Sequence, residues 1–186
     1  MIAYLSGPIE NAENDGAEWR EDITSWLDQN LKHSVFNPVL ETKSIMEHLD
    51  AHDFRSMKIT DPLEYKKIIR EIIKLDLNAV VHKSDYLIVK WDRSVLKGGG
   101  THGEVTIAYW MKKPIYIVNS LPIKDMSSWI FSCSDFIFND FDSLKKKLIQ
   151  IFSSIQIDFQ IFFLLPQGLR IKKMVIYFGS QIKNEK

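Results

Sequence analysis

The segment from Asp85 to Val118 constrains the fold of this 186-residue chain most, because a glycine-rich turn and a helix separate two apolar strands in it. The first strand reads DYLIVKW and the second IYIV. A helix between two buried strands is typical of a parallel α/β sheet, in which ligands bind at the carboxyl ends of the strands. Glu104 lies in the opening turn of this helix and is therefore a candidate for chemistry.

The turn before that helix offers a structural alternative for Glu104. Gly98, Gly99 and Gly100 permit a tight backbone turn, and Thr101 is a good helix N-cap. Thr101 and Glu104 then have the spacing of a capping box, in which the glutamate bonds back to the threonine amide. Taken alone, this tetrapeptide favours the cap over a catalytic role.

A second acid shifts the balance towards function. Residues 65–81 are predicted to form a helix, and Asp76 lies on its apolar stripe at the 3.6-residue period. The stripe consists of Ile69, Ile72, Ile73 and Val80. A carboxylate on the core-facing side of a helix is costly unless it is paired or functional. We therefore treat Asp76 as a second candidate.

Strands and helices alternate along most of the chain. The segments predicted by apolar periodicity and turn signals are a strand at Ile2–Ser6, a helix at Ala17–Leu31, a strand at Val35–Phe36, a strand near Phe136–Phe138 and a helix at about Phe141–Phe152. Residues 39–60 are polar and mixed, which predicts a lid or binding loop with one short helix around residues 44–52. The alternation predicts a flavodoxin-like, doubly wound parallel sheet of about five strands with helices on both faces.

The C-terminal part of the chain differs from the rest. We predict one domain over residues 1–153 and an extension of unknown role over residues 154–186. Two apolar runs in the extension, IQIDFQIFFLLP and MVIYF, are candidates for extra strands, although the sequence shows no partners for them. The extension covers a subunit interface, pairs with a sheet edge or is poorly ordered.

Composition excludes several classes of function. Lys plus Arg and Asp plus Glu both number 24, so nothing indicates attraction to a nucleic acid polymer or an anionic membrane. The single cysteine, Cys133, excludes an internal disulfide and a cysteine-based zinc site. His48 and His52 have a metal-binding spacing, but their polar surroundings favour a solvated helix. Because the first strand begins at residue 2 without a signal peptide ahead of it, we expect a cytoplasmic location.

Four segments together resemble the nucleoside 2-deoxyribosyltransferase family, which includes the nucleoside 5'-monophosphate N-glycosidases. They are YLSGP at 4–8, LDLNAVVHKSDYLIV at 75–89, GTHGEVTIAYWMKKPI at 100–115 and, more loosely, LPIKDMSSW at 121–129. The resemblance covers roughly residues 1–150 in order and spacing. It implies an enzyme that breaks the N-glycosidic bond of a small-molecule nucleoside or nucleotide without a metal or a cofactor.

The resemblance also implies roles for individual residues. Glu104 would attack the anomeric carbon and form a glycosyl-enzyme intermediate, ionised by the helix dipole. Asp76 would be the acid near the base, with a pKa raised by burial, and Tyr4 would orient Glu104. Substrate contacts would come from Ser6, Gly7, Pro8, Asp92, Gly98, Gly100, Thr101, Asp125 and Ser128.

One departure from the family leaves the substrate open. The deoxyribosyltransferases commonly carry an aspartate just before the glycine of the turn, whereas this chain has Lys97, and Asp92 lies earlier at the strand end. The nucleotide-cleaving relatives lack that aspartate too, but their first loop is basic and this chain has SGPIENAENDG. Nucleoside or 5'-monophosphate, and base or water as acceptor, remain alternatives. A non-catalytic nucleotide-binding module is a further one.

The LPIKDMSSW segment bears on assembly. In the family, the corresponding segment reaches into the site of the neighbouring subunit, where the transferases place an asparagine. This chain offers Asp125 and Ser128 instead, and we expect Trp129 to anchor the segment by burial. The resemblance implies a homodimer or larger homo-oligomer with shared sites.

Overall fold

The computed structural model describes residues 1–48 and 54–164. The chain divides into two compact units, Met1–Leu144 and Lys145–Lys186. The first unit contains the whole sheet, and the described part of the second is helical to Leu164. Within the described ranges, no helix is both long and apolar enough to span a membrane.

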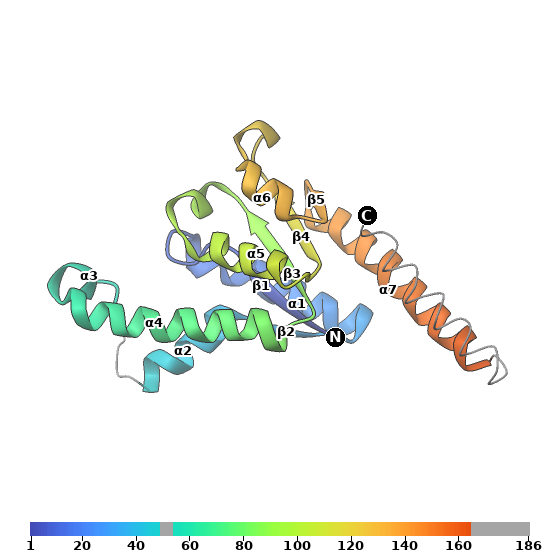
Figure 1. Cartoon of the computed structure of the whole chain (residues 1–186), viewed down its shortest axis with the longest axis horizontal. Coiled ribbons are helices and arrows are strands. Elements are labelled where there is room, and N and C mark those ends of the chain that lie inside the picture. Colours follow the sequence, from blue (N-terminus) through green and yellow to red (C-terminus); the bar gives the residue numbers. More distant parts are fainter. Residues whose placement is uncertain (49–53, 165–186) are drawn as a thin grey trace. The chain divides into compact units, whose positions relative to one another are not determined.

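The first unit is built on one sheet of five parallel strands (Figure 1). The strands are β1 (Ile2–Ser6), β2 (Ser34–Phe36), β3 (Tyr86–Trp91), β4 (Ile115–Asn119) and β5 (Phe136–Phe138). Their order is β2-β1-β3-β4-β5, which is the flavodoxin-like order of a doubly wound sheet. The predicted fold class is confirmed, and each predicted strand of this unit is present.

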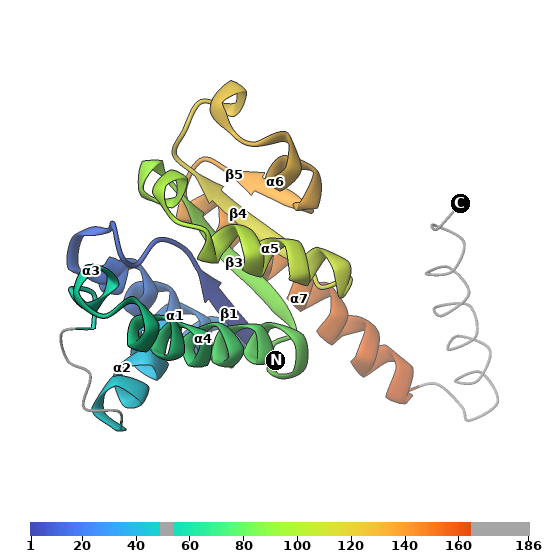
Figure 2. The ribbon, with the colours of Figure 1, turned by 60° about the vertical axis from the view of Figure 1, so that its left-hand side comes forward.

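Helices cover both faces of the sheet. The described helices of the first unit are α1 (Ala17–Leu31), α2 (Pro38–His48), α3 (Met57–Thr60), α4 (Pro62–Asn78), α5 (Gly100–Trp110) and α6 (Ser128–Cys133). A further helix, α7 (Phe141–Leu164), begins in the first unit and continues into the second. Right-handed crossovers place α1 on one face and α4 and α5 on the other, because the chain moves outward from β1 to β2 and then in the opposite direction across the sheet. Figure 2 shows α4 and α5 together on one side, with α1 behind the strands.

The helix that carries Asp76 starts as its sequence predicts. Asp61 is the N-cap of α4, Pro62 is its first residue, and the Asp61 carboxylate accepts a hydrogen bond of 3.1 Å from the amide of Glu64. The helix ends in a wider π-helical turn at residues 79–83, where the Ser84 hydroxyl donates to the Ala79 carbonyl at 2.8 Å. Asp76 therefore lies in the last turn of the regular helix.

Two predictions about local structure are wrong. Residues 39–60 do not form a long loop: α2 begins at Pro38, and the Asn37 side chain caps it by accepting from the amide of Val39 at 3.1 Å. The Asn37–Pro38 pair after β2 starts a helix, since proline fits the first helical turn. Residues 154–164 are helical and do not form a strand. The sequence did not reveal this, because a short apolar run is compatible with either structure. Residues 49–53 and the MVIYF run lie outside the described residues.

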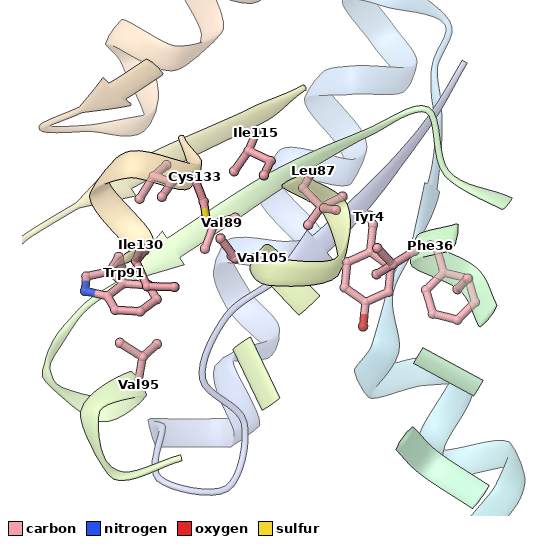
Figure 3. Packing of buried hydrophobic residues seen from close by; sticks show 14 of the residues in the cluster. Tyr4, Phe36, Leu87, Val89, Trp91, Val95, Val105, Ile115, Ile130 and Cys133 are labelled. Atoms are coloured by element: carbon pink, nitrogen blue, oxygen red, sulfur yellow. The ribbon is translucent and has the colours of Figure 1, made fainter. Parts of the chain in front are cut away.

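The core of the first unit lies between the sheet and α5. Leu87 and Ile115, on neighbouring strands, belong to the same buried cluster as Val105 of α5 (Figure 3). The ring of Tyr4 stacks on Phe36 with centroids 5.3 Å apart, and the two side chains lie next to one another in the same figure. This packing fixes the Tyr4 ring, so its hydroxyl has a defined position relative to α5.

Candidate active site

A cleft of about 790 Å³ opens beside the carboxyl end of β1. The β1–α1 loop, α2, α4 and the start of α5 contribute to its walls. Of the residues predicted to form a site, those that line the cleft are Gly7, Pro8, Asp76, Gly98, Gly100, Thr101 and Glu104. This position agrees with the general rule for ligand sites in open parallel sheets.

Glu104 is held by two hydroxyl groups of β1. Its side chain is buried, and its carboxylate accepts a hydrogen bond of 3.0 Å from the Tyr4 hydroxyl at Oε1 and a short one from the Ser6 hydroxyl at Oε2. Both donors lie about 100 positions away in sequence, at separations of 100 and 98. The carboxylate is therefore fixed by the sheet and not by its own helix.

The capping-box alternative is wrong for this glutamate. Helix α5 begins at Gly100 with Gly99 as its N-cap, so Thr101 lies inside the first turn and makes no side-chain cap. Glu104 is then in the second turn, beyond the reach of the free amides at the helix start. The helix dipole acts mainly within the first turn, so hydrogen bonds carry more of the stabilisation of this anion than we expected.

Burial raises the pKa of Glu104, while the hydrogen bonds from Ser6 and Tyr4 and the positive charge of Arg20 oppose that rise. Burial and the negative charge of Glu104 raise the pKa of Asp76 to about 7. Within the described ranges, no hydrogen-bond donor reaches the buried Oδ1 atom of Asp76. Of the two acids, Glu104 has the donors that stabilise an anion, and Asp76 is about half protonated at neutral pH.

The Tyr4 hydroxyl interacts with both acids. Burial, followed by the charges of Glu104 and Asp76, raises its pKa well above the ordinary value. The hydroxyl therefore stays protonated and donates a hydrogen bond to Glu104. This arrangement places two buried carboxyl groups around one fixed donor.

Four predicted contact residues do not line the cleft. Ser6 is buried, and its hydroxyl donates to Glu104. The Asp92 carboxylate accepts from the Ser94 amide at 2.8 Å and lies 3.7 Å from the Lys90 ammonium, so it caps the short turn after β3. Asp125 and Ser128 are exposed, in the turn before α6 and at its first residue. Trp129 is 64% exposed, which contradicts the predicted anchoring by burial within the chain.

The cleft also contains residues that the sequence analysis missed. Lys43 of α2 and Arg55 add positive charges to its lining, and Met46 adds an apolar surface. They were missed because their region was interpreted as a loop. The apolar stripe on α4 has a different role from the predicted one: Ile69, Ile72 and Ile73 line the cleft, and Ile73 is 49% exposed.

Removal of the Tyr4 hydroxyl tests the geometry around Glu104. We expect Tyr4→Phe to lower kcat/KM about 10- to 100-fold, because a hydrogen bond to a charged group contributes about 1.5–3 kcal/mol. The ring still stacks on Phe36, so the thermal midpoint should change little. Steady-state rates of base release measure the effect, and Tyr116→Phe, the same change at a core tyrosine outside the cleft, is the control. Equal rates for both variants would contradict the proposed orienting role.

Comparison with known proteins found a similarity of structure. The structure resembles a solved 2-deoxyribosyltransferase from the psychrotolerant bacterium Bacillus psychrosaccharolyticus, described as a biocatalyst for the synthesis of antiviral and antitumoral nucleosides. The TM-score is 0.52 at 16% sequence identity, over 78% of this chain and 90% of that chain. Neither the protein-family models nor the curated proteins gave a match. The similarity shows that this chain and a 2-deoxyribosyltransferase share the flavodoxin-like fold.

Proposed function

We propose that this protein breaks the N-glycosidic bond of a nucleoside or nucleotide and transfers the sugar to another nucleobase. One observation carries the proposal: a buried glutamate fixed by two hydroxyl groups shares a cleft with an aspartate whose pKa is raised by burial to about 7, so that it can give and take a proton near neutral pH. A nucleophile and a proton donor with separate proton affinities are what a double displacement at an anomeric carbon requires.

In the first half of the reaction, the Glu104 carboxylate attacks the anomeric carbon, and the bond between that carbon and the base nitrogen breaks. Asp76 gives its proton to the leaving base, either at the nitrogen released from the sugar or at another basic atom of the ring. The product is a glycosyl ester on Glu104. In the second half, an incoming base attacks the same carbon, the ester bond to Glu104 breaks, and the proton of the incoming base goes to Asp76.

Transfer to water is the second candidate, and a cationic side chain in the cleft favours it. Lys43 and Arg55 line the same cleft as the glycine turn at residues 98–100, together with the acids Glu10, Asp15 and Glu47, and Arg55 pairs with Asp15 at 2.9 Å. The Lys43 ammonium and the backbone amides at the start of α5 are suited to a phosphate. A 5'-monophosphate substrate and a hydrolytic second step would follow. A non-catalytic nucleotide-binding module is the third reading, and it predicts no covalent adduct.

A substrate panel separates these functions. Deoxynucleosides, ribonucleosides and their 5'-monophosphates are incubated with and without an acceptor base, and free bases and new nucleosides are measured by chromatography. Mixed nucleosides that form only with the acceptor support transfer, and base release from monophosphates without an acceptor supports hydrolysis. A mass increase on the Glu104 peptide after acid quench supports the intermediate. Tight binding without any base release would leave only the binding module.

We also propose that the site is completed by a second copy of the chain. Asp125 and Ser128 are exposed and do not line the cleft of their own chain, so any contact with substrate would have to be made in a neighbour. The exposed Trp129, whose indole N–H donates to Thr106 at 3.0 Å, lies next to Ser128 and would be covered by such an assembly.

Complementation tests the shared site. A Glu104→Ala chain mixed with an Asp125→Ala/Ser128→Ala chain should regain up to about a quarter of normal activity, because one of two sites in each mixed dimer receives only intact parts, and about half of the dimers are mixed. Base release after mixing and re-equilibration is the measurement, and either variant alone is the control. Inactive mixed dimers of verified composition would show that each site is built from one chain.

A further inference from the structure

Arg20 of α1 is a fully buried cation whose hydrogen bonds all go to backbone carbonyl groups. Its guanidinium donates to the carbonyl oxygens of five residues at 2.9–3.4 Å, and its Cζ atom lies 4.6 Å from the centroid of the Trp19 ring. The acceptors are Leu5, Gly7, Pro8, Asp15 and Gly16. Four of these five residues lie in the β1–α1 loop, and three of the four, Gly7, Pro8 and Asp15, line the cleft.

This arrangement has no carboxylate in direct contact with the guanidinium: in the described part of the chain, Arg20 forms no ion pair. An unpaired buried charge is costly to a folded protein. Burial lowers the pKa of Arg20 to about 10, which still leaves the side chain charged at neutral pH. Its position therefore needs a reason other than packing.

We propose that Arg20 is a positioning residue that ties down the β1–α1 loop beside the cleft and supplies the positive charge opposite the Glu104 carboxylate. The loop argument rests on the five carbonyl bonds and on Gly16, whose φ of +67° is left-handed. A Cβ atom at Gly16 would come within 2.7 Å of the Arg20 guanidinium and 2.8 Å of the Pro8 carbonyl. The loop and the arginine thus fit each other closely.

The charge argument rests first on position: Arg20 donates to the carbonyl of Leu5, the β1 residue between the two whose hydroxyls hold Glu104. Glu104 of α5, Tyr4 of β1, Asp76 of α4 and Asp15 before α1 are the titratable groups that act on it, and the effect of Glu104 is the largest among them. In return, Arg20 lowers the pKa of both Glu104 and Asp76. Arg20 therefore favours ionisation of the nucleophile, which burial disfavours. This inference rests on the proposed function and deepens it, because it assigns a cation that acts together with the Ser6 and Tyr4 hydrogen bonds on the ionisation of Glu104.

The test measures ionisation of Glu104 without relying on activity. Side-chain carboxyl groups of glutamate are labelled with ¹³C, and the Glu104 signal is identified by its loss in Glu104→Gln. We expect Arg20→Met to raise the titration midpoint of Glu104 by about one pH unit or more, as for a carboxylate that loses a nearby opposite charge. Arg20→Lys should stay within about 0.3 unit of the unmodified protein, because the charge remains. Arg70→Met, at an exposed arginine of α4, is the matched control.

An unchanged Glu104 midpoint in folded Arg20→Met would overturn the inference, whether or not the protein releases bases. If that variant does not fold, the Arg20 Nε–H resonance of the unmodified protein is followed against pH. Its chemical shift should change with pH at the titration midpoint of Glu104, and this change should be absent in Glu104→Gln. A chemical shift that shows no change at that midpoint would equally overturn the inference. If the proposed function holds, the acid limb of kcat/KM moves with the midpoint, and KM rises in both Arg20 variants because the loop is less constrained.

Discussion

We expect base release to fall by on the order of 10⁴-fold or more in Glu104→Ala, because the covalent step of the proposed mechanism has no other nucleophile. The protein should stay folded. The variant loses two hydrogen bonds and some buried volume, a cost of about 1–3 kcal/mol against a typical stability of about 5–15 kcal/mol. Initial rates with the preferred substrate and urea unfolding measure the two effects.

Glu71→Ala is the control for this prediction, because Glu71 is an exposed glutamate on α4 that does not line the cleft. We expect its rate and stability to match those of the unmodified protein. Glu104→Gln separates charge from shape, since the amide keeps the volume of the side chain but has no nucleophilic oxygen anion. Turnover of folded Glu104→Gln at a normal rate would exclude the glycosyl ester and, with it, double displacement.

Asp76→Asn should lower kcat by about 10²- to 10⁴-fold, the range for loss of a general acid. In the unmodified enzyme, the pKa of about 7 places the alkaline limb of kcat/KM near neutral pH, because activity needs protonated Asp76. In the variant this limb should be absent, since the amide does not titrate. The pH-rate profile of both proteins is the measurement, and a limb that persists in Asp76→Asn would assign it to another group.

The same substitution has an effect on stability whose sign depends on pH. The pKa of Asp76 is about 7 in the folded chain and about 4 when unfolded, so the folded state binds the proton more tightly. Ionisation of Asp76 therefore does not lower the free energy of unfolding below about pH 4. It lowers that free energy increasingly as the pH rises from about 4 to about 7, and by a constant amount at higher pH. Asp76→Asn should gain stability over the unmodified protein by at most about 1.4 kcal/mol per pH unit across this window. Constant relative stability across this window would contradict the raised pKa. A clear loss of stability with retained activity would instead mark Asp76 as a member of a structural ion pair.

The sheet was predictable from the sequence because its strands are short apolar runs bounded by clear turn signals. The start of α4 was predictable for a similar reason: an aspartate, a proline and a glutamate follow one another in the order that a helix start favours. The start of α2 was missed although Asn37 and Pro38 give nearly the same signal. The residues after Pro38 are mostly polar, and α2 has no strong apolar stripe that would indicate a helix.

Part of the candidate site was also predictable, through the isolated charge of Asp76 and the position of Glu104 after the glycine turn. The geometry of α5 was not. Three consecutive glycines allow the helix to begin at more than one residue, and the choice of Gly99 over Thr101 as its N-cap decides that Glu104 faces β1. Arg20 escaped notice because its five acceptors are carbonyl groups, which leave no pattern in the side chains of a sequence.

Because two hydroxyl groups of β1 hold Glu104, the proposed activity depends on the register of that strand. Tyr4 and Ser6 are alternate residues of β1 and therefore project from the same face of the sheet, opposite Leu87 and Val89 of β3. A slip of β1 by one residue would turn both hydroxyls to the other face and leave the glutamate without donors. Contacts that span about 100 residues carry a large loop-closure entropy and form late in folding. During refolding, we therefore expect the proposed activity to return only after β1 has found its final alignment, later than the helical signal.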